Sequence, residues 1–384
     1  MRMQAPESAA DASEAMRSIA SEGLSVRIVG GATKLGWGSL TEPVEVQVST
    51  AGLAGAPEHN AADLTAVVAA GMRLADAQEV FAAAGQMLAL DPPLGADDAA
   101  TIGGVVAAGD SGPLRHRYGA ARDLLLGMQV ALADGTVARS GGMVIKNVAG
   151  YDLAKLFSGS FGTLGLITEV VARLHPLPVD RVTVVFTSDD PAALQRAALV
   201  LGAAPLELES LDLSWSRAEG AVLARLAGAS AEIRAAEAVR LVQGVGVDGR
   251  AEADDDGLWD TQRRRQRSAE GGLSVRVSAL MTELARVVAC ARRLGADASG
   301  RAALGLFWLT LPPADPEDLV GSIEAIRREL APRACVVLDA PAEVRRRVDV
   351  WSREEGPEMK LMRRVKARFD PRQLCNPGVF VGGI

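Results

Sequence analysis

Glycine is concentrated in the first half of this chain, and its placement constrains the fold more than any other feature. Residues 26–29 alternate as a strand and run directly into the glycine-rich segment 30–38. Because glycine lets backbone N–H groups converge on an anion, a strand that enters such a turn is typical of a phosphate-binding loop. Residues 100–170 hold a second, unusually dense set of glycines. The first half is therefore a candidate for a ligand site built from main chain.

The spacing of apolar residues predicts short strands and helices, and the pattern changes after about Pro178. A helix is expected over residues 9–19, and a hairpin is expected around Asp134-Gly135. Residues 181–340 carry more helical pattern and predict a separate α+β unit. Residues 342–369 predict a basic helical stretch that Pro371 ends.

Length and composition limit the class of protein. A chain of 384 residues predicts two or three domains, and 48% apolar with 23% charged residues is typical of a globular protein. The 41 basic and 48 acidic residues give a net charge of −7, which disfavours a nucleic-acid binder. Cys290, Cys335 and Cys375 lie far apart, so the chain lacks the pattern of an iron–sulfur site or a disulfide framework.

Hydropathy indicates no membrane segment. No apolar run approaches the ~20 residues of a membrane span, and residues 1–25 lack the apolar core of a signal peptide. We expect a cytoplasmic protein with no direct membrane span, and attachment to the inner membrane face through partners stays open.

Several motifs exclude other activities. Residues 109–113 read Gly-Asp-Ser-Gly-Pro, as in a serine protease, but only His59 precedes them and the chain before them is too short for two β-barrels. Neither Gly-x-Gly-x-x-Gly nor a P-loop occurs, which disfavours the corresponding nucleotide-binding folds. His59, His116 and His175 are scattered, so no metal site is predicted.

A series of short motifs resembles one family when taken in order. The motifs are Val29–Lys34, Asp91–Pro93, Ala100–Gly104, Asp110–Pro113, Tyr118–Asp123, Lys146–Asp152, Gly162–Glu169 and Asn376–Gly378. Together they resemble the vanillyl-alcohol oxidase, or PCMH-type, FAD-binding family. Within it they are most similar to the E-type FAD-binding subunits of bacterial glycolate oxidases, to which Lys146–Asp152 points. The resemblance is dense over residues 25–180 and returns at 360–380.

This resemblance implies an α+β fold in three parts. Residues 1–180 would form a PCMH-type FAD-binding domain of two α/β subdomains. Residues 181–345 would form an α+β cap domain. Residues 346–384 would form a C-terminal helix and tail that pack back on the FAD domain and return to the flavin.

The resemblance also implies roles for particular residues. Residues 30–34 would hold the pyrophosphate, residues 101–104 would line the flavin and ribityl chain, and residues 110–112 would lie nearby. Gly165 and Ile167 would contact the adenine end, and Asn376 would approach the isoalloxazine. The expected cofactor-binding residues are Gly30, Gly31, Ala32, Thr33, Lys34, Pro92, Thr101, Ile102, Gly103, Gly104, Asp110, Ser111, Gly112, Gly165, Ile167 and Asn376.

Two departures from the family pattern affect the chemistry. The family often has Asn where this chain has Asp110, and a carboxylate near the flavin would disfavour its anionic reduced form. Members with a covalent flavin often carry a histidine in the first glycine loop, whereas residues 32–34 here are Ala-Thr-Lys. We therefore expect noncovalent FAD.

The resemblance implies oxidation of a 2-hydroxy acid, such as glycolate, to a 2-oxo acid by a complex. This chain would be its FAD-binding subunit, beside a second flavoprotein subunit and an iron–sulfur subunit that receive the electrons. Such chemistry needs a proton acceptor and a cation for the carboxylate. In relatives, cap-domain histidines and a metal serve this purpose, but residues 181–384 here contain no histidine.

Catalytic residues therefore stay unassigned, with Arg117 and Tyr118 as the nearby candidates. Two alternative functions also stay open. One is a stand-alone FAD-dependent oxidase or dehydrogenase of another alcohol or hydroxy acid. The other is a non-catalytic scaffold subunit that FAD stabilises.

Overall fold

The chain forms two compact units. A computed structural model describes residues 1–143, 152–216, 219–253, 256–352 and 356–384. Unit 1 comprises Met1–Ser111, Gly119–Leu177 and Arg353–Ile384, and unit 2 comprises Gly112–Tyr118 and Pro178–Ser352. The three-part division expected from the sequence stays a prediction.

Unit 1 contains two main sheets. A three-stranded parallel sheet has the order β1-β3-β2, and a five-stranded antiparallel sheet has the order β4-β5-β9-β7-β8. The nearly continuous apolar sequence of β9 suits its position between β5 and β7, because both of its faces are buried. The strands are β1 (Arg2–Gln4), β2 (Val26–Val29), β3 (Val46–Ser49), β4 (Glu58–Asn60), β5 (Thr65–Ala69), β7 (Leu125–Ala131), β8 (Val137–Gly141) and β9 (Leu166–Arg173), with β6 (Gln86–Met87) and β10 (His175–Pro176) as a separate pair.

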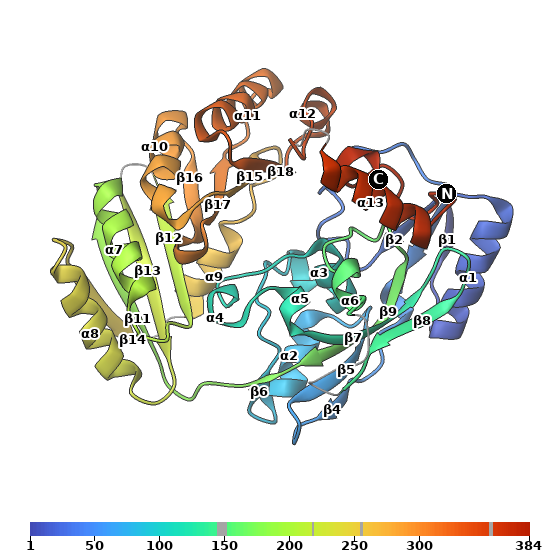
Figure 1. The fold of residues 1–384 in the computed structure, drawn as a ribbon, viewed down its shortest axis with the longest axis horizontal. Coiled ribbons are helices and arrows are strands. Elements are labelled where there is room, and N and C mark those ends of the chain that lie inside the picture. The colour runs from blue at the N-terminus through green and yellow to red at the C-terminus, as the bar shows by residue number, and fades with distance from the viewer. Residues whose placement is uncertain (144–151, 217–218, 254–255, 353–355) are drawn as a thin grey trace. The chain divides into compact units, whose positions relative to one another are not determined.

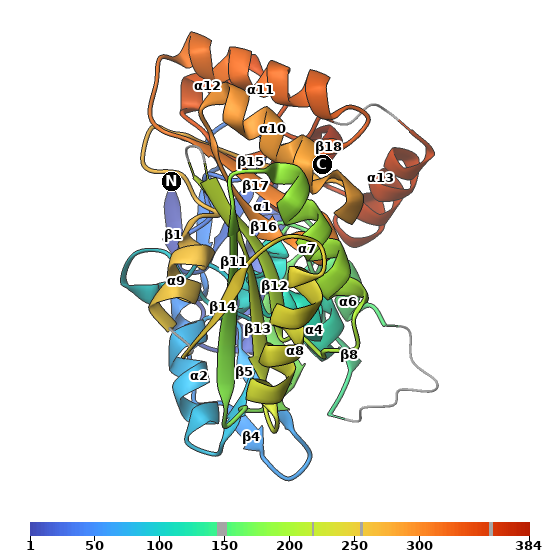
Figure 2. The same ribbon diagram turned by 90° about the vertical axis from the view of Figure 1, so that its left-hand side faces the viewer.

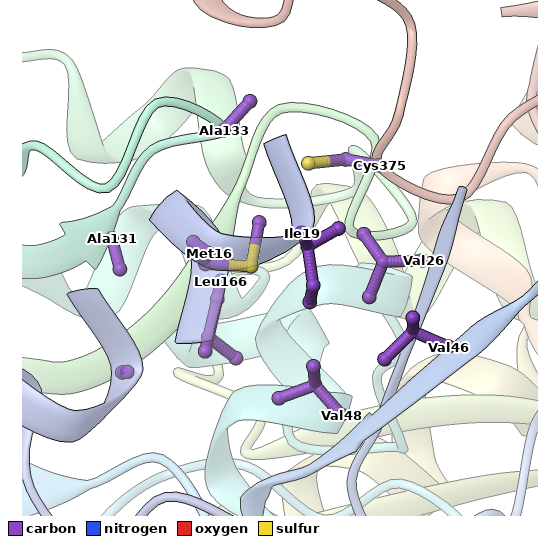
Figure 3. Close-up of a cluster of buried hydrophobic side chains, with 10 residues drawn as sticks. Met16, Ile19, Val26, Val46, Val48, Ala131, Ala133, Leu166 and Cys375 are labelled. Atoms are coloured by element: carbon purple, nitrogen blue, oxygen red, sulfur yellow. The ribbon is translucent and has the colours of Figure 1, made fainter. Parts of the chain in front are cut away.

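Helix α1 (Ala9–Glu22) covers the parallel sheet. The Ser8 side chain caps its first turn, and Gly23, at a φ of 72°, ends it. Met16 and Ile19 lie on its apolar face, which packs into a cluster with residues of β2, β3 and β9 (Figure 3). The other helices of unit 1 are α2 (Leu74–Ala82), α3 (Ile102–Ala108), α5 (Ala121–Leu124), α6 (Ala154–Phe157) and α13 (Pro357–Phe369).

The C-terminal tail returns to the parallel sheet of unit 1. Cys375 makes a parallel β-bridge with Val26 and joins the cluster beneath α1 (Figure 3). Burial raises the pKa of its thiol, so the thiol stays protonated and acts as a small apolar group. This return brings the end of the chain beside the strand that enters the first glycine-rich loop.

In its described residues, unit 2 is built on one antiparallel sheet of eight strands. Its order is β14-β11-β13-β12-β16-β17-β15-β18. Helices α7, α8, α10 and α11 pack on one face, and α9 lies over the other (Figures 1 and 2). The strands are β11 (Arg181–Ser188), β12 (Ser210–Ser216), β13 (Glu219–Ala227), β14 (Gly249–Ala253), β15 (Leu273–Ser278), β16 (Asp297–Arg301), β17 (Leu306–Leu311) and β18 (Ala334–Asp339). The helices are α4 (Arg115–Tyr118), α7 (Pro191–Ala203), α8 (Ala231–Gln243), α9 (Asp256–Arg264), α10 (Leu284–Leu294), α11 (Pro316–Leu330) and α12 (Ala342–Arg347).

The sheet face beneath α9 is polar at its centre. Asp212 and Arg301 lie opposite each other on β12 and β16, are fully buried, and form an ion pair with an Oδ2–Nη1 distance of 2.5 Å. Gln262 of α9 donates to Asp212 Oδ2 at 3.0 Å, and Trp259 Nε1 donates to Thr183 Oγ1 at 2.8 Å. These hydrogen bonds attach α9 to the sheet.

Some expected elements are confirmed, and one is interrupted. The hairpin is present, with Ala131 opposite Val137 in β7 and β8. The basic helical stretch expected over residues 342–369 is divided between two helices, α12 in unit 2 and α13 in unit 1. It leaves the helical conformation at Val348 and pairs with β18 through a hydrogen bond from Val337 N–H to Val350 O. Residues 146–151 of the Lys146–Asp152 motif lie outside the described residues.

The helices are short. Among the described residues, none is long and apolar enough to cross a membrane.

Candidate functional site

A pocket in unit 1 gathers glycine segments that are far apart in the sequence. They come from the loop after β2, the start of α3, the turn before β9 and the C-terminal tail. The pocket has an empty volume of about 390 Å³, part of which is open to solvent. Six of the expected cofactor-binding residues line it, namely Gly30, Gly103, Gly104, Gly165, Ile167 and Asn376.

The loop after β2 presents backbone donors that the protein does not use. Ala32 adopts a φ of 58°, which turns the chain sharply. Within the described residues, the N–H groups of Gly31 and Ala32 have no hydrogen-bond partner. Adjacent, outward-directed N–H groups in a turn can bind an anion.

The start of α3 is packed tightly against this loop. Thr101 caps the helix, and its Oγ1 accepts from Gly104 N–H at 3.2 Å. A Cβ at Gly30 would lie 2.3 Å from Thr101 Oγ1, and a Cβ at Gly31 would lie 1.5 Å from Ala99 O. A Cβ at Gly103 would lie 2.8 Å from the Ala70 side chain. The structure thus gives these glycines a role in packing between protein segments, in addition to any approach by a ligand.

Lys34 and Asp110 form a buried ion pair beside the glycine loop. The distance between Lys34 Nζ and Asp110 Oδ2 is 3.3 Å, and the side chains are 8% and 4% exposed. Lys34 Nζ also donates to Pro93 O at 3.3 Å and lies over the Trp37 ring. Ser111 N–H donates to Asp110 Oδ1 at 2.9 Å. The positive charge of Lys34 therefore offsets the negative charge that Asp110 would bring to the site.

Removing either member of this pair is expected to destabilise unit 1. Lys34→Met leaves a buried carboxylate, and Asp110→Asn leaves a buried ammonium, so each should lower the free energy of unfolding by about 3 kcal/mol. The double variant should lose less than the sum of the two, and denaturant unfolding of all four proteins measures the coupling.

The exposed pair Lys155–Asp152 provides a matched control, because the same substitutions apply to side chains that are 37% and 49% exposed. Its coupling energy should stay below about 1 kcal/mol. Equal coupling energies for the two pairs would contradict a special contribution from Lys34 and Asp110.

Asn376 fastens the C-terminal tail to two walls of the pocket. Its Oδ1 accepts from Ile28 N–H at 2.8 Å, and its Nδ2 donates to Phe161 O at 2.6 Å. A Cβ at Gly162 would lie 2.8 Å from Asn376 Nδ2, so glycine is needed for this approach. The structure therefore shows a positioning role for Asn376 as well as a place in the pocket wall.

The remaining expected residues are not among those that line the pocket. Ile102 is buried in α3, Ser111 is buried next to Asp110, and Pro92 is buried in the loop after β6. The methyl group of Thr33 would lie 2.5 Å from a Cβ at Gly95. Gly112 belongs to unit 2, so the structure does not place it relative to the pocket.

Five lining residues were not among the expected ones. They are Ile28, Thr50, Ala107, Phe161 and Gly162. Gly162 opens a motif that carried the family resemblance, so its glycine was a usable signal. Phe161 contributes through a φ of 56° that its residue type does not predict. Ile28, Thr50 and Ala107 occupy an ordinary strand, turn and helix, and only their tertiary positions bring them to the pocket.

Arg117 and Tyr118, the nearby catalytic candidates, are held within unit 2. Tyr118 Oη donates to Glu209 Oε1 at 3.4 Å, and Arg117 Nη1 donates to Glu207 O at 2.8 Å. Burial, with the carboxylate of Glu209, raises the pKa of Tyr118 to about 12. Its phenol therefore stays protonated at neutral pH and is a donor rather than a general base.

Comparison with known proteins connects this fold and pocket to flavoenzymes. A model described as an FAD binding domain matches residues 3–141, and one described as the C-terminal domain of FAD linked oxidases matches residues 345–380. The chain is 40% identical over 124 residues to glycolate oxidase subunit GlcE of Escherichia coli, a segment that covers 32% of this chain and 35% of that subunit. It is 28% identical to D-2-hydroxyglutarate dehydrogenase of Xanthomonas citri over 91% of this chain and 82% of that enzyme.

The fold has a close structural neighbour. An alkyldihydroxyacetonephosphate synthase superposes with a TM-score of 0.73 over 98% of this chain and 76% of that chain, at 14% identity. This similarity concerns the fold alone.

Fold, pocket and matched segments define a flavoprotein with an FAD-binding domain of the PCMH type, and the expected fold class and cofactor are confirmed. These matches confirm the expected resemblance to the PCMH-type FAD-binding proteins, near the glycolate oxidase subunits. The segment shared with GlcE spans about a third of that subunit's length, 35%.

The residues of the pocket and of the glycine loop that adjoins it at Gly30 fit FAD. The N–H groups of Gly31 and Ala32, which lack partners within the described residues, suit the acceptor oxygens of a diphosphate. Gly104 and Gly165 carry no side chain into the pocket, so a planar ring has access to the main chain there. When bound, FAD supplies a two-electron acceptor that can pass electrons on singly.

Proposed function

We propose that this chain binds FAD noncovalently in the glycine-lined pocket and serves as the FAD-binding subunit of a complex that oxidises a 2-hydroxy acid. The observation that carries the proposal is the pocket itself, which is lined by glycine main chain. It is adjoined at Gly30 by the loop in which the N–H groups of Gly31 and Ala32 lack partners within the described residues. In this proposal, residues 30–34 face the pyrophosphate and Thr101–Gly104 lie along the flavin and ribityl chain. Gly165 and Ile167 contact the adenine end, and Asn376 closes the wall near the ring.

Noncovalent binding is supported by the chemistry of the lining. Among the residues that line the described pocket there is no histidine, cysteine or tyrosine, the side chains to which a flavin could be attached. FAD would therefore be retained by main-chain donors and packing.

The scarcity of histidine and cysteine in the sequence supports a role as one subunit of a complex. Conversion of a 2-hydroxy acid to a 2-oxo acid removes two electrons and two protons, and it needs a base and a cation near the substrate. Residues 181–384 contain no histidine, and Tyr118 stays protonated at neutral pH. The cysteines Cys290, Cys335 and Cys375 are separate and buried, so electrons would leave through a partner with its own cluster.

The partners proposed are a second flavoprotein subunit and an iron–sulfur subunit, and the substrate class is a small 2-hydroxy acid such as glycolate. The relatives support this class, because one is named a glycolate oxidase subunit and another a D-2-hydroxyglutarate dehydrogenase. The proposed location is cytoplasmic, with any membrane attachment through the partners.

The D-2-hydroxyglutarate dehydrogenase similarity also favours a second candidate function. It extends over 91% of this chain, which would suit a stand-alone dehydrogenase of a hydroxy acid.

Anaerobic spectroscopy separates the candidates. The purified chain is incubated with FAD, freed of excess FAD, and mixed with glycolate, D-lactate or D-2-hydroxyglutarate while the flavin absorption is followed. The subunit proposal expects a yellow protein whose flavin is not bleached alone but is bleached in the assembled complex. Bleaching of the isolated chain would support the stand-alone enzyme, and a protein that stays colourless after incubation with FAD would contradict both.

The scaffold alternative is tested in the assembled complex. A variant that assembles normally without FAD in this chain, yet keeps full turnover, would show that this flavin is not needed for electron transfer.

A further inference from the structure

Thr50 is an unexpected member of the pocket wall with an unsatisfied hydroxyl group. It lines the pocket, its side chain is 5% exposed, and within the described residues its Oγ1 has no hydrogen-bond partner. A buried hydroxyl without a partner is costly, so such a group facing a ligand pocket points to a hydrogen bond that the ligand completes.

The backbone holds this hydroxyl in place. Thr50 begins a short 3-10 turn, and Ser49 Oγ accepts from Ala51 N–H at 3.2 Å. Leu53 N–H donates to Thr50 O at 2.9 Å. A Cβ at Gly71 would lie 1.8 Å from Thr50 O, which shows how closely that segment packs on the turn. The hydrogen bonds of the turn and the packing of Gly71 therefore hold the backbone of Thr50 in place.

The hydroxyl lies at the end of the pocket where the glycine loop begins. A Cβ built at Gly30 would lie 3.6 Å from Thr50 Oγ1. The next two residues are Gly31 and Ala32, whose N–H groups have no partner within the described residues. A hydroxyl donor next to a loop with N–H donors suits an anion, and the phosphates are the negatively charged part of FAD.

We propose that Thr50 Oγ1 donates a hydrogen bond to a phosphate oxygen of FAD. This inference rests on the proposed FAD site and adds to it a residue that does not belong to the glycine motifs.

The test compares Thr50→Val, which removes the hydroxyl with little change of shape, with Thr50→Ser, which keeps it. FAD affinity is measured by flavin fluorescence in a titration of the stripped protein, so the readout does not depend on turnover. Thr50→Val should raise the Kd for FAD about tenfold or more, because the bond is made to a charged acceptor. Thr50→Ser should stay within about threefold of the wild type, since its hydroxyl can make the same bond.

Thr65→Val is the matched control. Thr65 lies in β5 of the same unit, is fully buried, and also has an Oγ1 without a hydrogen-bond partner within the described residues, but it does not line the pocket. This variant should bind FAD like the wild type. Unchanged FAD affinity in Thr50→Val, or an equal loss in Thr65→Val, would overturn the inference.

A second ligand tests the assignment to phosphate. Riboflavin has the ring and ribityl chain but no phosphate, so its affinity should be equal in the wild type and Thr50→Val. If riboflavin binds too weakly to measure, ADP serves as competitor and should lose the same factor as FAD. An equal loss for riboflavin, or undiminished competition by ADP, would refute the phosphate contact, whereas a wild type that does not bind FAD would refute the proposed function itself.

Discussion

Replacement of Lys366 by methionine is expected to lower the free energy of unfolding by about 3–5 kcal/mol, because it removes one partner of a buried ion pair. Lys366 lies in α13 and is 4% exposed, and its Nζ donates to Asp370 Oδ2 at 2.7 Å. It also donates to Thr163 O at 2.7 Å and to Cys375 O at 2.9 Å. The variant would leave a buried carboxylate and two carbonyl groups without this cation.

The same substitution should weaken FAD binding. Thr163 follows Gly162, and Cys375 precedes Asn376, so the ammonium group holds the neighbours of two residues that line the pocket. Loss of this anchor should let both walls move. The FAD content of the purified protein and its unfolding in denaturant measure the two effects.

Lys360→Met is the control for this prediction. Lys360 lies on the same helix but is exposed, so its loss should change stability by less than about 0.5 kcal/mol. If Lys366→Met does not fold, Lys366→Met/Asp370→Asn, which removes both charges, should recover part of the yield. Equal unfolding curves for Lys366→Met and Lys360→Met would show that the buried contacts do not stabilise unit 1.

Gly31→Ala is expected to disrupt the first glycine loop and abolish retention of FAD. An added Cβ would lie 1.5 Å from Ala99 O and 2.5 Å from its carbonyl carbon, so main chain rather than a flexible side chain would have to move. Such overpacking should cost about 3 kcal/mol, and it would displace the N–H groups at residues 31 and 32. Flavin content after gel filtration and thermal unfolding with and without FAD test this expectation.

Gly36→Ala provides a control in the same loop. A Cβ there would meet no atom within 4 Å, and Gly36 is not in the left-handed conformation. This variant should bind FAD and unfold like the wild type. A Gly31→Ala protein that keeps its flavin and its stability would mean that the Ala99 carbonyl can withdraw at little cost.

The glycine motifs could be recognised in the sequence because their information is local. Gly30, Gly103, Gly104 and Gly165 each belong to a short segment whose residue types are recognisable without knowledge of the rest of the chain, and the fold brings them to one pocket. The sequence did not reveal that residue 31 must be glycine because a side chain there would collide with Ala99 O. That contact joins two loops that are 68 residues apart in the sequence (99 − 31).

In unit 2, the local sequence pattern was not sufficient to predict the secondary structure of every segment. Residues 219–227, Glu-Gly-Ala-Val-Leu-Ala-Arg-Leu-Ala, are rich in helix-forming residues, yet they form β13 between β11 and β12. Pairing with two neighbouring strands and burial of the strand outweigh a weak helical preference.

The sequence by itself determined the resemblance to PCMH-type FAD-binding proteins, FAD as the cofactor, and the hairpin around Asp134-Gly135, since these depend on residue types at short spacing. Tertiary structure alone decided that Lys366, which lies in the basic helix α13, is buried. It also decided that Thr50, which belongs to none of the recognised motifs, lines the pocket. Lys366 is 203 positions from Thr163, and its burial is favourable only because three acceptors converge there. Hydrogen bonding and close packing between distant segments depend on where the folded chain places each group, and residue type alone does not carry that information.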